Sequence, residues 1–218
     1  HHHYGNEKIL PEFSEAYFAE LISKAESKNL PLGVGENTES FTQRITPILF
    51  DPNIAPKRVN KDSKVDMVKA SSTGFYEGVS QKEVSDFYHA MIDKKDATPP
   101  SYGLNSKVVK ENEKLVEKIW KGGGMYTKSI EKIVYWLEKA SAVAENKTQK
   151  KALDLLIKYY KSGDLRDFDA YNIAWVADVD SRIDVVNGFI EVYGDPIGYK
   201  ASYESVVSIR DIEASKRI

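Results

Sequence analysis

The sequence predicts a mixed α+β fold that is mostly helical, with a bundle-like helical region and a small antiparallel sheet towards the C-terminus. Apolar residues at spacings of three, four and seven mark consecutive helices between residues 125 and 177. After them, two stretches alternate between apolar and polar residues, which is the pattern of half-buried strands. The chain has 218 residues, enough to bury a sizeable core.

Composition excludes several classes of function. Charged residues make up 29% of the chain and its formal net charge is -2, so no electrostatic footprint for nucleic acid or an anionic membrane is present. No apolar run approaches the ~20 residues that a membrane span needs, and the N-terminus lacks the pattern of a secretory signal. Cysteine is absent, which excludes thiol catalysis, thiolate metal ligation and disulfides within the chain. Nucleic acid and membrane are therefore not expected partners.

Histidine is scarce, and this bears on metal binding. The chain contains only His1, His2, His3 and His89. A catalytic zinc normally takes three protein ligands, often from a helical His-Glu-x-x-His pair, and no such pair occurs here. His89 is interpreted as a surface or satisfied residue rather than a ligand. We expect this chain to bind no zinc by itself.

Residues 1–66 are expected to combine one helix with an irregular connection. Pro11 stands where a first-turn proline belongs, and an apolar stripe continues from it to about Asn29. Leu30 to Asp66 carries four prolines and no sustained period. It is interpreted as a long irregular connection with a short helix or strand around Phe41 to Phe50.

Residues 67–121 are expected to hold a helix and short strands. Ser80 and Glu83 form a capping box, in which a hydroxyl and a carboxylate satisfy the free amides of a helix start. The buried face of that helix consists of Val84, Phe87, Tyr88 and Met91. Stretches at 105–110 and 115–120 are separated by a turn and predict a hairpin or two edge strands.

Residues 122–180 carry the clearest helical patterns. The first predicted helix spans about 125–144, and the second begins at Thr148 as its cap and ends at Gly163. A third, from about Leu165 to Ala177, is expected to bury Phe168, Ile173, Trp175 and Val176 in part. The aromatic residues Tyr159, Tyr160, Trp136 and Trp175 are assigned to the core and to helix contacts rather than to a ligand platform.

Residues 181–218 begin with the strand that carries the candidate site. Alternation from Asn187 to Tyr193 puts Asn187, Phe189, Glu191 and Tyr193 on one face. Glu191 and Tyr193 would project the same way, roughly 7 Å apart at the backbone, beside the rim of a cleft. Gly194-Asp195-Pro196 then turns the chain. Tyr203 to Arg210 alternates again and is expected to pair antiparallel with the first strand, and Asp211 caps a final helix.

Three motifs together resemble dipeptidyl peptidase III, the zinc exopeptidases of family M49. They are Asn187 to Gly198, with the pattern Gly-Phe-Ile-Glu-x-Tyr-x-Asp-Pro-x-Gly, Ile133 to Ala140, and Phe75 to Val79. The resemblance extends over most of the chain and is closest to bacterial members. It implies a two-lobed enzyme in which a mostly helical lobe carries zinc on a His-Glu-x-x-Gly-His helix. The other lobe binds the peptide as an added strand.

No zinc motif occurs here, so the resemblance covers only the part of the family sequence upstream of it. The chain is expected to be a single fragment, 1–218, of the substrate-binding lobe. By itself it should be inactive. The complete protein would be a zinc-dependent hydrolase, an aminopeptidase-type protease that removes dipeptides from the N-terminus of oligopeptides. Its partners would be the oligopeptide and the missing zinc-carrying lobe.

The resemblance also implies roles for two residues. Glu191 matches the glutamate that holds the free α-amino group of the peptide, and Tyr193 matches the tyrosine that donates a hydrogen bond to the scissile carbonyl. The family favours the cytoplasm, and the periplasm stays open because the true N-terminus is not expected in this chain.

Other interpretations remain open. The chain could instead be a non-catalytic helical domain that binds a peptide or another ligand, or serves as a scaffold. A glycosidase built on Glu191 is a more distant alternative, because no second carboxylate can be placed opposite it from sequence. His1-His2-His3 is either the stub of a purification tag or, as favoured here, a native segment of a longer protein shortened by design or proteolysis.

Overall fold

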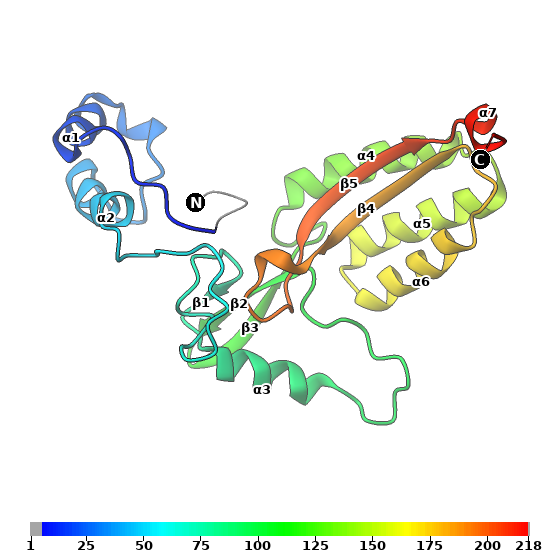
Figure 1. Cartoon of the computed structure of the whole chain (residues 1–218), viewed down its shortest axis with the longest axis horizontal. Helices are drawn as coiled ribbons and strands as arrows, with labels where there is room; N and C mark the ends of the chain where they lie inside the picture. Colours follow the sequence, from blue (N-terminus) through cyan, green and yellow to red (C-terminus); the bar gives the residue numbers. More distant parts are fainter. Residues whose placement is uncertain (1–5, 218) are drawn as a thin grey trace. The chain divides into compact units, whose positions relative to one another are not determined.

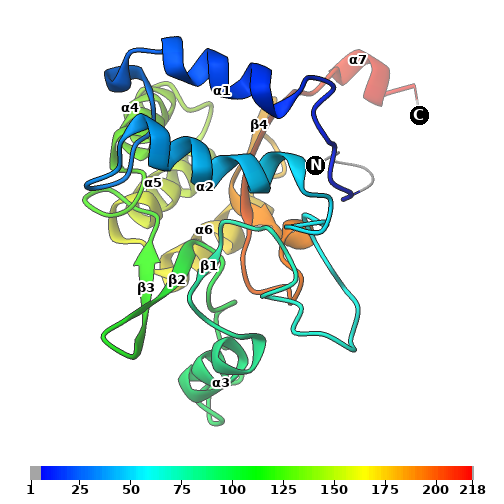
Figure 2. The same ribbon diagram turned by 90° about the vertical axis from the view of Figure 1, so that its left-hand side faces the viewer.

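A computed structural model describes residues 6–217, and both interpretations of His1-His2-His3 concern residues outside this part. The chain divides into two compact units at Ser72 and Thr73. In the first unit, α1 (Glu15–Lys24) and α2 (Thr38–Phe50) lie side by side, with the short 3₁₀ helix η1 (Ser27–Asn29) between them in sequence (Figure 2).

The start of α1 differs from the prediction. Ser14 is its N-cap and accepts a hydrogen bond from the backbone N–H of Tyr17, so the helix begins after Pro11 rather than at it. The rings of Phe13 and Phe18 contact that of Phe50 on α2, with centroids 5.8 and 6.0 Å apart. These aromatic contacts hold the two helices together.

The segment around Phe41 to Phe50, predicted as a short helix or strand, is a helix and is longer than expected. Asn37 and Ser40 form a reciprocal capping box, so α2 begins at Thr38. Pro47 lies inside it, where it supplies no N–H to the helical ladder. The predicted irregular connection ran from Leu30 to Asp66, and its part after α2, residues 51–66, has turns, bends and one isolated bridge from Lys57 to Glu7.

A three-stranded sheet opens the second unit. β1 (Tyr76–Glu77) pairs parallel with β2 (Ser106–Glu111), which pairs antiparallel with β3 (Lys114–Ile119). Of the two predicted alternatives, a hairpin or two edge strands, the hairpin is therefore confirmed. Its turn residues, Asn112 and Glu113, both have positive φ, 48° and 60°, the geometry that matches the twist of the flanking strands. α3 (Gln81–Met91) has the predicted capping box of Ser80 and Glu83 and buries Val84 and Tyr88.

Three helices form the core of this unit: α4 (Thr127–Ala142), α5 (Lys147–Ser162) and α6 (Leu165–Val176) (Figure 1). Of these three helices α5 has the most buried residues, including the fully buried Leu156 and Tyr160. Its N-cap is Asn146, not Thr148, because the Asn146 side chain accepts from the backbone N–H of Gln149. Gly163 ends it with a φ of 71°, as expected for a C-terminal glycine.

Two predictions of burial are wrong. Ile173 and Val176 on α6 are 74% and 68% exposed, because the face that packs inward is set by Phe168, Tyr171 and Ala174 at spacings of three. Trp136 on α4, assigned to the core, is 68% exposed. The other assigned aromatics fit: Tyr159 and Tyr160 are buried and Trp175 is half-buried.

A long two-stranded ribbon lies along these helices (Figure 1). β4 (Ile183–Glu191) pairs antiparallel with β5 (Ser202–Ile209), as predicted. The ribbon is tied to the helices by Tyr160, which donates to Asn187, and by the indole of Trp175, which donates to Asp184 at 2.7 Å. Asp211 caps α7 (Ile212–Ser215). In the part of the chain that is described, no helix has the length and apolarity required to traverse a bilayer.

The helical core allows a matched test of burial. Ile157 on α5 is 8% exposed, whereas Ile173 on α6 is 74% exposed. We expect Ile157→Ala to lower the free energy of unfolding by about 2–5 kcal/mol, because it removes buried methyl groups and leaves a cavity. Ile173→Ala should change it by about 0.5 kcal/mol or less. Denaturant unfolding followed by circular dichroism measures both, and equal losses would contradict this packing.

Candidate functional site

The end of β4 contains a β-bulge that changes the face on which Glu191 lies. Phe189 pairs with Tyr203 and Glu191 pairs with Ser202, so Ile190 is an extra residue with no partner position on β5. Such an insertion shifts the alternation of side chains by one position. The prediction that Glu191 shares a face with Phe189 is therefore wrong. Glu191 lies on the opposite face, together with Ser202.

Glu191 meets a second carboxylate on this face, that of Glu204. Glu204 stands two residues after Ser202 on β5 and pairs with Gly188, so both glutamates lie on one side of the ribbon. Burial, then the negative charge of Glu204 and a hydrogen bond with it, raise the pKa of Glu191 above its usual range. Both side chains are half-buried and so remain reachable from solvent.

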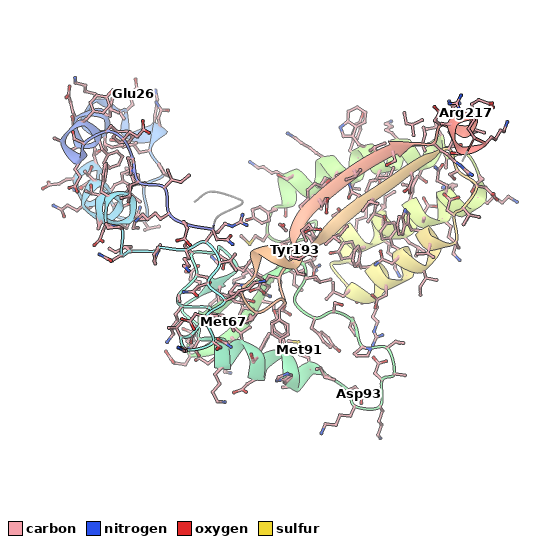
Figure 3. All side chains as sticks on the ribbon, in the orientation of Figure 1. Glu26, Met67, Met91, Asp93, Tyr193 and Arg217 are labelled. Atoms are coloured by element: carbon pink, nitrogen blue, oxygen red, sulfur yellow. The ribbon has the colours of Figure 1, made fainter. Side chains whose placement is uncertain are left out.

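Tyr193 lies just beyond the strand rather than within it. β4 ends at Glu191, and Tyr193 belongs to the 3₁₀ turn η2 (Val192–Gly194). Strand alternation therefore does not decide its direction, contrary to the prediction. Its side chain is 75% exposed at the end of the β4 ribbon (Figure 3). The carboxylate and the phenol flank one short turn, and neither is sealed in the core.

A buried carboxylate organises the connection that follows Tyr193. Asp195 is 2% exposed and accepts four hydrogen bonds. The phenol of Tyr76 on β1 donates at 2.6 Å. The backbone N–H groups of Ile197, Tyr199 and Lys200 donate at 3.2, 2.7 and 2.7 Å. Asp195 thus closes its own loop and ties that loop to the three-stranded sheet.

The same connection inserts a fully buried lysine, Lys200. Its ammonium donates to the phenol of Tyr88 on α3 and, at 2.8 Å, to the hydroxyl of Ser106 on β2. The carboxylate of Glu117 on β3 lies 3.7 Å away. Burial lowers the pKa of Lys200 to about 8, an effect that the negative charges of Glu117 and Asp195 oppose.

Gly103 makes room for this cluster. Its φ is +95°, which L side chains rarely adopt. A Cβ there would lie 2.8 Å from Cζ of Tyr88 and 3.2 Å from Nζ of Lys200. The buried ammonium therefore requires a glycine at this position.

An apolar pocket of about 550 Å³ opens on the other face of the ribbon. Its aromatic lining comes from Phe75, Trp120, Tyr126, Phe189 and Tyr203. Phe189 and Tyr203 point away from Glu191 and Glu204, because paired residues share a face and neighbours along a strand do not. Ser202, the strand partner of Glu191, also lines the pocket, so the pocket reaches the end of the ribbon at which the carboxylate pair lies.

The described residues do not fit a catalytic zinc. Between residues 6 and 217 no group of three histidine, aspartate or glutamate side chains is arranged to hold a metal ion. His89 lies exposed in the last turn of α3, which confirms its interpretation as a surface residue.

Sequence reasoning missed Glu204 and Lys200. The partner of Glu191 depends on the register of two strands, and the bulge that brings the glutamates together has no signal in the alternation. Lys200 resembled any lysine beside a turn. A signal was present only for Asp195, since Gly-Asp-Pro predicted a turn without revealing that the aspartate is buried.

Comparisons with known proteins place the chain in a class of hydrolases. The model of peptidase family M49 matches residues 50–218, most of the chain. This chain belongs to peptidase family M49, and the resemblance to dipeptidyl peptidase III is thereby confirmed. The bacterial branch remains a prediction.

Two relatives and one solved structure illustrate what the chain is similar to. Dipeptidyl peptidase 3 of Dictyostelium discoideum is 23% identical over 229 residues, covering 97% of this chain and 31% of that protein. Nudix hydrolase 3 of Arabidopsis thaliana is 28% identical over 148 residues, covering 67% of this chain and 17% of that protein. The structure of DPP III from Caldithrix abyssi matches 93% of this chain and 36% of its own, with a TM-score of 0.54 and 20% identity, and so supports the fold. The chain spans about a third of the length of the Dictyostelium relative.

The interaction between Glu191 and Glu204 can be tested through the pKa of Glu191. We expect Glu204→Gln to lower the pKa of Glu191, because it removes a negative charge and supplies an amide donor. Glu191 keeps its proton to a higher pH in the folded chain than in the unfolded chain. Its contribution to stability is therefore full at low pH and is lost as the pH rises through the folded pKa. Carboxyl ¹³C NMR titration measures the pKa.

The control is Glu213→Gln on α7, where the exposed glutamate pairs with Lys216. It should leave the Glu191 titration unchanged. An unchanged Glu191 pKa in Glu204→Gln would show that the two carboxylates do not interact.

Proposed function

We propose that this chain supplies the substrate-binding part of a zinc-dependent dipeptidyl peptidase, which releases dipeptides from the N-terminus of oligopeptides. The observation that carries the proposal is the carboxylate pair of Glu191 and Glu204, half-buried at the end of the ribbon beside the exposed Tyr193. Membership in family M49 and similarity to dipeptidyl peptidase 3 support it.

The carboxylate pair suits the α-ammonium of a peptide. Two carboxylates held together repel when both are charged, and this repulsion adds to the effect of burial in raising the pKa of Glu191. An ammonium placed against them relieves that repulsion and donates charge-assisted hydrogen bonds to both. In this proposal Glu191 and Glu204 together hold the amino terminus, and Glu191 releases its proton when the peptide binds.

Tyr193 would serve the reacting end of the same substrate. Its phenol is exposed two residues after Glu191, so the peptide bond it reaches is close to the anchored terminus. A phenol that donates to the carbonyl oxygen stabilises the negative charge developing there. Anchoring the amino terminus at a fixed distance from Tyr193 would set the length of the released product at two residues.

The zinc on which the family depends would be held by another part of the complete protein. The described residues offer no ligand set for it, so no step through the metal is assigned to this chain. Within this proposal the chain contributes binding and carbonyl polarisation, and needs the zinc-carrying lobe as its partner.

The role of Tyr193 can be tested in the complete protein. We expect Tyr193→Phe to lower kcat by about tenfold or more, with little change in KM, because the hydroxyl acts on charge that develops only in the transition state. Tyr135→Phe, on the outer surface of α4 and 52% exposed, is the control and should leave kcat unchanged. Near-normal turnover of a dipeptide-naphthylamide by Tyr193→Phe would remove Tyr193 from the site.

The role of Glu191 predicts a different kinetic change. We expect Glu191→Gln to weaken binding of a peptide with a free amino terminus by about tenfold, since one charge-assisted bond is lost. Binding of the same peptide after N-acetylation should be weak for both proteins and should not differ between them. Calorimetry measures the affinities of the parent protein and of Glu191→Gln for the free and the acetylated peptide. If the variant bound the free peptide normally, a non-catalytic binding or scaffold domain would be the better description.

A further inference from the structure

The connection between β4 and β5 is fixed by two different means on either side of Tyr193. On the N-terminal side, Glu191 pairs with Ser202 in the ribbon, and the Ser202 hydroxyl also donates to the backbone carbonyl of Glu191 at 3.3 Å. On the other side the chain has no strand partner until Ser202. There, the internal bonds of the Asp195 loop and the side chain of Lys200 hold it.

Lys200 links this loop to three separate elements. Its ammonium contacts Tyr88 on α3, Ser106 on β2 and Glu117 on β3, and it lies over the ring of Tyr88, 4.7 Å from the centroid. Tyr88 and Ser106 also donate to Glu117, at 2.6 and 2.5 Å. The ammonium therefore completes a polar cluster in which α3, β2 and β3 each contribute one side chain and the loop contributes Lys200.

Burial of this lysine is not explained by stability. Taking an ammonium out of water costs more than burying an apolar side chain of similar size, and buried ion pairs are often no better than an apolar replacement. The lowered pKa of Lys200 reflects that cost. An ammonium forms directional hydrogen bonds and so gives the loop a defined geometry, which an apolar side chain does not.

We propose that Lys200 is a positioning residue, whose buried ammonium, together with Asp195, fixes the turn that presents Tyr193 to the peptide carbonyl. The inference rests on the proposed function. Tyr193 precedes Asp195 by two residues, and Asp195 donates its N–H to the carbonyl of Val192 at 3.0 Å, so a shift of the loop is transmitted to the turn. Glu191 is held by the ribbon and should not move with it.

If Lys200 fixes Tyr193 but not Glu191, its loss should affect kcat more than KM in the complete protein. Lys200→Met, which keeps most of the volume and removes the ammonium, should lower kcat by about tenfold or more while KM changes by about threefold or less. Added to Tyr193→Phe, it should lower kcat by only about twofold more, because both changes remove the same interaction. Lys161→Met is the matched control: this exposed lysine pairs with Glu138 on the surface.

A second readout does not depend on activity. Hydrogen exchange of the backbone amides of Tyr199 and Lys200, which donate to Asp195, should be at least about tenfold faster in Lys200→Met. Amides of α5 should exchange as in the parent. Tyr76→Phe removes one donor to Asp195 without changing charge, and should shift exchange and kcat in the same direction. It keeps the test valid if Lys200→Met does not fold.

The outcomes separate the two proposals. If Tyr193→Phe lowers kcat but Lys200→Met and Tyr76→Phe do not, the positioning role is overturned and the proposed function stands. A double variant that loses only about twofold more kcat than Tyr193→Phe alone supports positioning. Fully additive losses, or unchanged amide exchange in the loop, overturn it. Normal turnover by Tyr193→Phe overturns the proposed function itself.

Discussion

The hydrogen bonds to the buried carboxylate of Asp195 are the constraint on which the candidate site depends. This one side chain satisfies three backbone N–H groups of its own loop and the phenol of Tyr76 on β1. A buried carboxylate is tolerated only when it is fully hydrogen-bonded, so the loop has little freedom to rearrange. The ribbon that carries Glu191 and the sheet that contains Tyr76 are joined through it.

The β-bulge at Ile190 is the second constraint. Without it, Glu191 would share the face of Phe189, which packs against Trp120 with ring centroids 4.8 Å apart. With it, Glu191 turns to the face of Glu204. One inserted residue thus exchanges an apolar environment for an acidic one. Burial is the largest cause of the raised pKa of Glu191, and the charge of Glu204 on this face adds to it.

The two faces of the ribbon consequently have different chemistry. One face carries the two glutamates, and the other lines an apolar pocket through Phe189 and Tyr203. The helices α4, α5 and α6 hold the ribbon in place by a few directional bonds, such as that from Trp175 to Asp184, in addition to apolar packing. A rigid helical support suits a site whose functional groups lie at a strand end, where a strand alone would be mobile.

The sequence by itself determined the fold class, the helices α3 to α6, the antiparallel pairing of β4 with β5, the capping box of Ser80 and Glu83, and the resemblance to family M49. These follow from local periodicity, capping chemistry and a long motif, each of which depends on residues close together in the sequence. The tertiary structure alone decided which face Glu191 occupies, its pairing with Glu204, and the burial of Lys200. Each of these depends on strand register or on contacts between residues far apart in the chain, and no local pattern encodes such contacts.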